Sequence, residues 1–233
     1  MTKELLSKRG IEFESLDVEN DPAALAALKQ LGLSTVPVVA VGDRFVHGWN
    51  PPKIAELVGF DLKERIFPPE EQIRALEMLF DAALRAVRQV PDECLTMKSP
   101  DRDRKLRELT HHIFRILEVA VDADAVGDFP AKAWLAGKDV PSHTSSERIA
   151  RYGEAALAKF RAWYRTIDPA AFSRIIETDV GPRSLAQIME RTKSHAGQHV
   201  RQLYVFLGWM NIEPDRPLTE ADFKDIDLPE ALW

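Results

Sequence analysis

The apolar residues of the chain follow a helical pattern from residue 70 onward. Four segments carry them at spacings of three and four, which is typical of helices that bury one face. Helices that are apolar on one side stabilise each other by packing those sides together, so we predict an all-α four-helix bundle. The four segments cover residues 70–87, 101–121, 146–163 and 185–207.

The segments around these helices also carry signals. Ser145 or Ser146 can cap the third helix, and Ser184 stands where the fourth begins. The connection at 122–141 is long and contains aromatic residues, so we interpret it as a loop that covers a functional site. Residues 213–233 lack helical spacing but keep apolar residues, and we expect them to pack back on the helices as an extended strap.

A shorter pattern fills the first 60 residues and predicts the order α-β-α-β-β-α. Phe67-Pro68-Pro69 cannot continue a helix, so residues 61–70 are predicted to be a linker. The chain is thus predicted to be an α+β protein of two domains, 1–60 and 71–212, followed by the strap. The expected N-terminal elements are helices at 2–9, 22–31 and 51–58 and strands at 11–18, 35–41 and 44–47.

Three histidines stand out on the predicted helices. His195 and His199 are one turn apart on the apolar face of the fourth helix, and His112 lies on the apolar face of the second. His111 is rotated by about 100° from that face. Three inward imidazoles would form a three-nitrogen metal site with open positions, as in catalytic zinc sites. The alternative is that these histidines are core residues with hydrogen-bond partners.

The helical part resembles the DinB/YfiT-like superfamily of four-helix metalloproteins over residues 70–212. The likeness rests on four helical segments, a histidine in the second, and the pair in the fourth, followed by His199-Val200-Arg201-Gln202-Leu203. It implies a divalent metal, zinc or nickel, held by His112, His195 and His199, and the chemistry of metal-dependent thiol transferases or a thiol-dependent isomerase. The chain departs from the family at the end of this motif. The family often has His-Arg-Gly-Gln-Leu there, whereas this chain has His199-Val200-Arg201-Gln202-Leu203.

The N-terminal part resembles a glutaredoxin of the thioredoxin-fold superfamily whose beginning is missing. The likeness rests on residues 5–13, 16–18, 35–37 and 42–48. It implies a truncated thioredoxin-like module, a cis Val36-Pro37 bond, and a site for a thiol such as glutathione at Thr35, Val36 and Pro37.

Two departures limit this second resemblance. No cysteine precedes Cys94, and thiol-disulfide exchange requires a thiolate, so the module cannot act as a glutaredoxin. The family's Gly-Gly-x-x-Asp is replaced by residues 47–51. Two interpretations stay open, a docking or dimerisation module and a retained thiol site. Without the family's first strand, either 11–18 pairs with 36–41 or another chain fills the gap, and the exposed edge would favour a homodimer.

Composition excludes several classes of function. The net charge is −6, and the sequence contains no cluster of Lys and Arg with interleaved aromatics. We therefore do not expect the protein to bind nucleic acid. The sequence contains no run of 18 apolar residues, so we do not expect a membrane span. The single cysteine, Cys94, cannot form an intrachain disulfide, which fits the reducing cytoplasm.

We therefore weigh three functions. The favoured one is a metal-dependent thiol S-transferase, whose partners are a small-molecule thiol and an electrophile, with Tyr152 as a catalytic candidate that could donate to a metal-bound ligand or simply pack in the core. The second is a hydrolase that uses metal-bound hydroxide, for which Glu108, Glu118 and Glu190 are candidate bases. The third is a binding or scaffold protein without catalysis. Cys94 is either a reactive thiol near the metal or a bystander.

Overall fold

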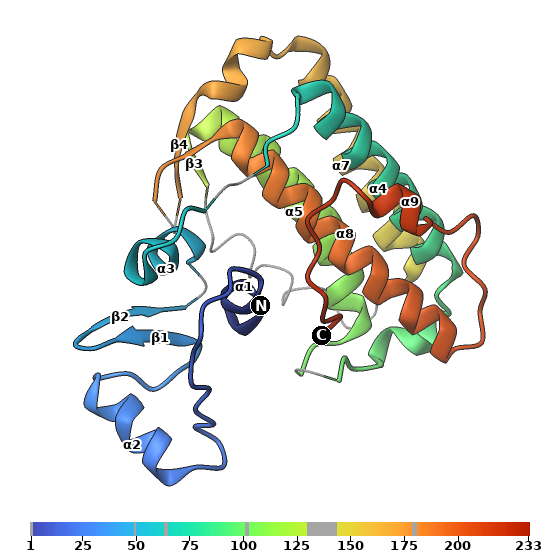
Figure 1. The fold of residues 1–233 in the computed structure, drawn as a ribbon. Helices are drawn as coiled ribbons and strands as arrows, with labels where there is room; N and C mark the ends of the chain where they lie inside the picture. Colours follow the sequence, from blue (N-terminus) through green and yellow to red (C-terminus); the bar gives the residue numbers. More distant parts are fainter. Residues whose placement is uncertain (1, 49, 63–64, 101–102, 130–143, 179–180) are drawn as a thin grey trace. The chain divides into compact units, whose positions relative to one another are not determined.

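The computed structural model describes residues 2–48, 50–62, 65–100, 103–129, 144–178 and 181–233 (Figure 1). The chain divides into two compact units, residues 1–65 and 66–233, which are described separately. Within the described residues, no helix is both long and apolar enough to cross a membrane.

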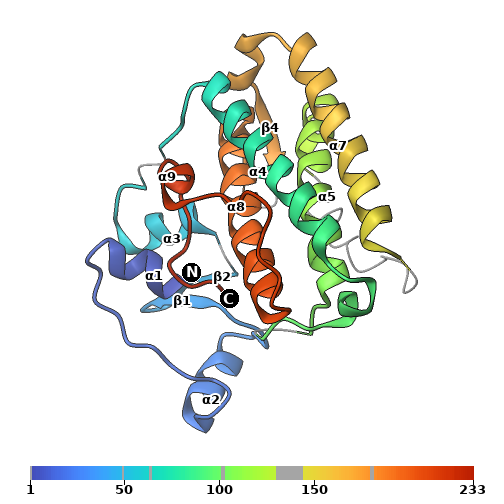
Figure 2. The same cartoon turned by 90° about the vertical axis from the view of Figure 1, so that its right-hand side faces the viewer.

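Four long helices form the body of the second unit: α4 (Pro69–Gln89), α5 (Leu106–Val126), α7 (Ser146–Thr166) and α8 (Leu185–Trp209). Helix α4 packs on α7 and α8, and α5 packs on the same two helices (Figure 2). Each helix contributes one phenylalanine with no exposed surface to the common core. These are Phe80, Phe114, Phe160 and Phe206. Burial of one such side chain stabilises the fold by roughly 1.5–3 kcal/mol.

The helix starts follow local hydrogen bonds. The Oγ atom of Ser145 accepts from the Arg148 backbone N–H at 3.2 Å, so Ser145 is the cap of the two that were predicted. Ser184 caps α8 in the same way, which confirms the predicted start of that helix. Helix α5 begins at Leu106 instead of residue 101, because the Leu106 N–H bonds the Met97 carbonyl and the Glu108 carboxylate accepts from the Lys105 N–H.

The segment predicted as a long connection, 122–141, is partly regular. Helix α5 continues to Val126 and ends at Gly127, whose φ of 73° is a left-handed conformation that glycine adopts without strain. Residues 130–141 lie outside the described residues, so the interpretation of this segment as a cover for the site stays a prediction.

The described residues also form a small three-stranded sheet and two 3-10 helices that were not predicted. The strands are β3 (Asp128–Phe129), β4 (Ile175–Thr178) and β5 (Arg183–Ser184), with β3 parallel and β5 antiparallel to β4. The sheet joins the end of α5 to the start of α8. The 3-10 helices are η1 (Asp92–Thr96), inside the predicted loop after α4, and η3 (Pro169–Ser173).

The C-terminal tail packs back on the helices. It is irregular except for α9 (Glu220–Phe223), and it follows α8, as Figure 2 shows. Arg85 of α4 donates to the backbone carbonyls of Asp215 and Arg216. At the other end, the ring of Trp233 packs 5.6 Å from that of Phe206.

The first unit contains α1 (Thr2–Lys8), α2 (Pro22–Gln30), the antiparallel strands β1 (Val38–Val41) and β2 (Arg44–His47), and α3 (Pro51–Val58). Its buried residues include Leu6, Leu28 and Ile54. The Val36-Pro37 bond is cis, as the resemblance implied.

The predicted strand at 11–18 is wrong. Residues 11–17, all within the described part of the chain, form no strand, and 12–17 are exposed. A strand exists only when its backbone groups pair with a neighbour, and this segment has not paired with β1. Asp17 instead accepts hydrogen bonds from the backbone N–H groups of Glu19 and Asn20, which makes a turn.

Candidate metal centre

Helices α5 and α8 bring the three predicted histidines together. One nitrogen from each of His112, His195 and His199 lies within 4.8 Å of the other two. The ring centroids are 5.2 Å apart for His112 and His195, 5.3 Å for His112 and His199, and 4.6 Å for His195 and His199. Two nitrogens on one zinc, each about 2.0–2.1 Å from it, lie at most about 4.2 Å apart, so the observed spacing is close to that of a shared ion.

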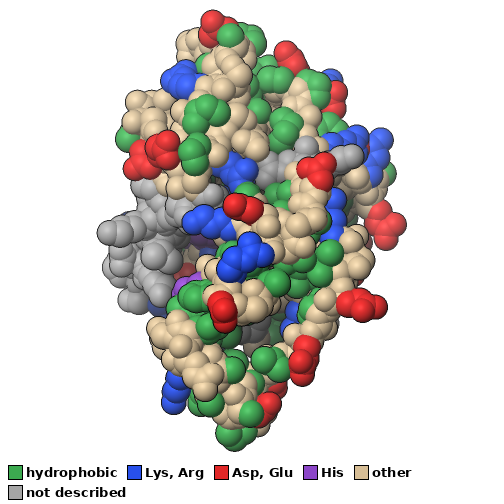
Figure 3. Space-filling view, turned by 60° about the vertical axis from the view of Figure 1, so that its left-hand side comes forward, with side chains coloured by type: hydrophobic (Ala, Val, Ile, Leu, Met, Phe, Trp, Pro, Cys, Tyr) green, Lys and Arg blue, Asp and Glu red, His purple; other side chains and the backbone are tan. Residues whose placement is uncertain are grey.

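The three imidazoles differ in exposure. His112 and His199 have only 6% and 5% of their surface exposed, whereas His195 is half-buried. On the face drawn in Figure 3, Lys and Arg side chains are interspersed with Asp and Glu, and histidine occupies only a small area. The cluster therefore has a buried side and, at His195, a side that is open to solvent.

His199 presents a nitrogen that has no partner in the part of the chain that the structure describes. Its Nδ1 atom lies 2.6 Å from Oε1 of Gln202, and its buried Nε2 atom has no hydrogen-bond partner among the described residues. A buried polar atom without a partner costs free energy, and most such atoms in native proteins are satisfied. A divalent cation beside His112 and His195 would satisfy this one, so the residues present fit a metal.

The electrostatics agree with this fit. Burial holds the pKa of His199 well below its ordinary value, and the nearby His195, Arg104 and His112 lower it further. His199 is therefore neutral at physiological pH, and neutral imidazole is the form that binds metals.

The candidate bases are engaged elsewhere. Glu108 accepts from the Lys105 N–H at the start of α5, and Glu190 forms an ion pair with Lys193 at 2.7 Å. Glu118 accepts from Tyr152 and pairs with Arg115. The cluster consists of the three histidines, and none of these carboxylates belongs to it.

Tyr152 contacts His111 and Glu118. Its hydroxyl donates to Oε2 of Glu118 at 2.6 Å, and its ring stacks on that of His111 with centroids 4.4 Å apart. Burial and the hydrogen bond to Glu118 raise the pKa of Tyr152 well above its ordinary value. The hydroxyl is thus satisfied within the protein, which agrees with the alternative of a packed core residue.

The residues predicted to bind a thiol lie in the first unit. Thr35, Val36 and Pro37 are exposed, and Oγ1 of Thr35 lies 2.8 Å from Nε2 of His47. The Pro37 carbonyl accepts from the Gly48 N–H at 2.8 Å. Cys94 is half-buried in η1 and is not one of the three clustered residues.

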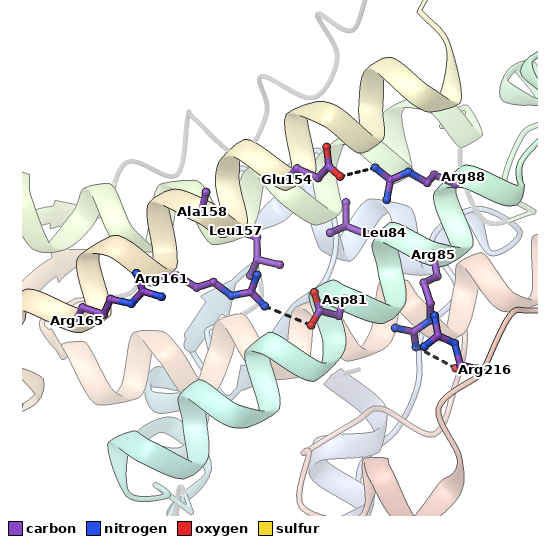
Figure 4. A pocket seen from close by; sticks show the side chains of 10 residues that line it. All are labelled: Asp81, Leu84, Arg85, Arg88, Glu154, Leu157, Ala158, Arg161, Arg165 and Arg216. Carbon is purple, nitrogen blue, oxygen red and sulfur yellow. Dashed lines mark hydrogen bonds and ion pairs between the residues drawn. The ribbon is translucent and has the colours of Figure 1, made fainter.

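A hollow opens between α4 and α7 (Figure 4). Its volume is about 550 Å³, and its lining includes Arg88, which pairs with Glu154, and Arg161, which pairs with Asp81. None of the clustered histidines lines it. Exposed ion pairs of this kind contribute little to stability. We therefore interpret the lining of the hollow as a network of surface ion pairs and not as part of the candidate site.

Sequence reasoning did not identify Gln202 or the tail as neighbours of the cluster. The available signal was spacing, since a residue three positions after His199 shares its helix face. The Nε2 atom of Gln202 donates to the backbone carbonyl of Leu232 at 2.7 Å, and nothing in the spacing of the tail indicates that contact.

Comparisons with known proteins cover both units. Residues 69–203 match the family model of the DinB superfamily, and residues 1–46 match that of glutaredoxin. The glutaredoxin-like protein NrdH of Escherichia coli K12 is 38% identical over 56 residues, which is 24% of this chain and 69% of NrdH. NrdH of Shigella flexneri matches with the same figures.

Solved structures resemble more than half of this chain in fold. A crystal structure of the mycothiol-dependent maleylpyruvate isomerase gives a TM-score of 0.50 at 14% identity, covering 59% of this chain and 61% of that one. A histidine-to-alanine mutant of the isomerase gives 0.53 at 13%, with 70% and 65% covered. A DinB-like protein from Bacillus cereus gives 0.53 at 14%, with 63% and 95% covered.

These likenesses differ in what they establish. The identities to solved structures show the fold alone, and the chain spans less than two thirds of the isomerase. The family models identify both parts of the sequence. The chain belongs to the DinB superfamily and carries an N-terminal glutaredoxin domain.

Proposed function

We propose that this protein is a metal-dependent enzyme that transfers a low-molecular-weight thiol to an electrophile, with zinc or nickel held by His112, His195 and His199. The observation that carries the proposal is the buried Nε2 atom of His199, which has no hydrogen-bond partner among the described residues, on one of three rings that each bring a nitrogen within 4.8 Å of the other two. The name of one protein with a similar fold states that it depends on mycothiol, which supports the choice of a thiol.

A divalent cation in such a site lowers the pKa of a coordinated thiol or water and supplies a nucleophile at neutral pH. The chain's own residues do the rest. His112 and His199 are the buried donors, and the half-buried His195 leaves one side of the site accessible. In the transfer, a sulfur–carbon bond forms, the bond from that carbon to its leaving group breaks, and the thiol proton passes to solvent.

The engaged carboxylates fit a thiol cosubstrate better than hydrolysis. Cys94, the only cysteine, is not one of the clustered residues, so a thiol that reacts there would come from a small molecule. The candidate bases Glu108, Glu118 and Glu190 bond to other groups. A thiol is far more acidic than water, so it needs a protein base less than a hydrolytic water does.

We assign the supporting parts of the chain accordingly. Residues 71–212 form the four-helix metal-binding domain, 61–70 the linker and 213–233 the C-terminal strap. Residues 1–60 contribute thiol recognition at Thr35, Val36 and Pro37. The support is the exposure of this segment, with 55% of Val36 accessible.

Metal content is the first test. We would measure it by mass spectrometry on untagged protein, with the alanine variants of His112, His195 and His199. We expect about one equivalent in the parent and loss in all three variants. His111→Ala is the matched control, because His111 stacks on Tyr152 and should leave metal content unchanged.

Turnover is the second test. The loaded protein should consume glutathione or mycothiol and an alkylating electrophile in equal amounts, and His195→Ala should not. Ester or amide cleavage without added thiol would replace the proposal with a hydrolase. A parent protein that binds no metal would favour the third function, a binding or scaffold protein without catalysis.

A further inference from the structure

We infer that the C-terminal tail is part of the metal centre, because its Leu232 carbonyl orients Gln202 and Gln202 in turn fixes the tautomer of His199. This inference rests on the proposed metal site and goes beyond it, since it gives positioning roles to residues outside the three ligands. Gln202 is 5% exposed, so its amide is removed from competing solvent.

The direction of each hydrogen bond follows from chemistry. The Leu232 carbonyl can only accept, so the amide nitrogen of Gln202 must face it, and the two atoms are 2.7 Å apart. The amide oxygen then faces Nδ1 of His199 at 2.6 Å, and an oxygen can only accept there. Nδ1 must therefore carry the proton, and Nε2 keeps the lone pair that a metal requires.

The opposite orientation would disable His199. If the amide of Gln202 rotated by 180°, its nitrogen would donate to Nδ1, and the neutral ring would carry its proton on Nε2. That proton would occupy the position that faces the shared ion. The tail carbonyl excludes this orientation because it would then face the amide oxygen, and two acceptors repel each other.

The tail is seated closely on the stretch of α8 that carries the ligands. Gly197 lies between His195 and His199, and a Cβ atom there would come within 3.0 Å of Leu228 Cδ2 and 3.3 Å of Ile226 Cγ2. The absence of a side chain at Gly197 thus lets the tail approach the helix.

Further contacts hold the tail on both sides of this seat. Arg201 donates to the Pro229 carbonyl at 2.9 Å, and Gln198 donates to the Leu232 carbonyl at 2.5 Å. The ring of Trp233 stacks on that of Trp209 with centroids 5.8 Å apart. The Leu232 carbonyl is therefore held at a fixed place beside Gln202.

The test compares two substitutions of Gln202 by zinc affinity, measured by competition with a chromophoric chelator. Gln202→Met keeps the length of the side chain but removes the acceptor, and we expect affinity to fall by about 10–100-fold, as for other groups that orient metal ligands. In Gln202→Glu, an ionised side chain can only accept, so one oxygen keeps the proton on Nδ1 of His199 while the other repels the Leu232 carbonyl and releases the tail. Because this tautomer no longer depends on the tail, we expect affinity within about threefold of the parent.

Deletion of residues 230–233 tests the tail itself. We expect the deletion to weaken zinc binding of the parent by about tenfold and to leave Gln202→Glu nearly unchanged, because a carboxylate has no wrong orientation. An equal loss in both backgrounds would mean that the tail only stabilises the fold and would overturn the inference.

A readout without metal separates orientation from stability. Nitrogen-15 NMR of the His199 ring in metal-free protein should show the proton on Nδ1 in the parent and in Gln202→Glu. It should show an increased share on Nε2 in the deletion variant. A parent that binds no zinc would overturn both the site and this inference. A parent that binds zinc no more tightly than Gln202→Met would overturn this inference alone.

Discussion

The ammonium group of Lys193 lies 2.7 Å from a carboxylate oxygen of Glu190, with 2% and 13% of the two side chains exposed. Glu190 also accepts from the Phe67 N–H at 2.9 Å and from Gln72 at 2.8 Å. Lys193 lies 4.0 Å from the centroid of the Phe67 ring, within the range of a cation–π contact. This buried pair fastens the segment around the start of α4 to α8.

Glu190→Gln should therefore be strongly destabilising. The substitution leaves a buried ammonium without its carboxylate, and we expect the free energy of unfolding to fall by about 3–5 kcal/mol. Chemical denaturation would measure it. The matched control is Arg151→Met, which breaks a largely exposed pair with Glu147 and should cost less than about 1 kcal/mol. Equal costs for the two variants would contradict the structural role of the buried pair.

Metal should stabilise the second unit through the three histidines. A ligand at 100 times its Kd stabilises the folded state by about 2.7 kcal/mol. For a protein of this size that corresponds to a rise in Tm of roughly 5–11 °C. We expect the rise on adding zinc to chelator-treated parent and to His111→Ala, but not to His195→Ala. Calorimetry would measure it, and the same rise in His195→Ala would indicate zinc bound elsewhere.

The positions of the three clustered histidines could be predicted from the sequence because each lies on a helix with a clear apolar stripe. The stripe fixes which face turns inward, and His112 and His199 are buried as their spacing predicts. The partner of Gln202 could not be predicted, since the tail is irregular and the position of the Leu232 carbonyl depends on contacts made only in the folded protein.

The errors in the strands have a related cause. Alternation at 11–18 says which side each residue would take in a sheet, but not whether a neighbouring strand is present to pair with it. The two-residue strands β3 and β5 are too short to show any period. Pairing and register depend on distant segments, whereas the amphipathic pattern of a long helix is local.

Removal of the Tyr152 hydroxyl should leave metal binding intact. The hydroxyl donates to Glu118, so Tyr152→Phe should lower the free energy of unfolding by about 0.5–1.5 kcal/mol. We expect zinc affinity and thiol turnover within about threefold of the parent. Parallel denaturation and turnover assays would check this, and a loss of turnover by more than tenfold with normal metal content would make Tyr152 a catalytic residue.

Alkaline pH should reduce the stabilising effect of the same hydroxyl. Burial and Glu118 raise the pKa of Tyr152 in the folded state, so above pH 10 the unfolded chain ionises there and the folded chain does not. The contribution of this group is therefore fully present below about pH 10 and is lost as pH rises. We expect the stability difference between the parent and Tyr152→Phe to shrink from pH 9 to pH 11, and a constant difference would contradict the shift.

Two helical glycines should respond in opposite directions to alanine. A Cβ atom at Gly153 of α7 would lie 2.6 Å from Cε1 of Phe114, whose ring is fully buried and cannot move aside freely. We expect Gly153→Ala to lower the free energy of unfolding by about 1–3 kcal/mol through overpacking, even though alanine favours helix.

At Gly208 of α8, a Cβ atom would meet no described atom within 4 Å, so Gly208→Ala should raise the free energy of unfolding by up to about 1 kcal/mol. Urea denaturation of both variants would test the close packing of α5 on α7, because stabilisation by Gly153→Ala would mean that Phe114 does not occupy this contact.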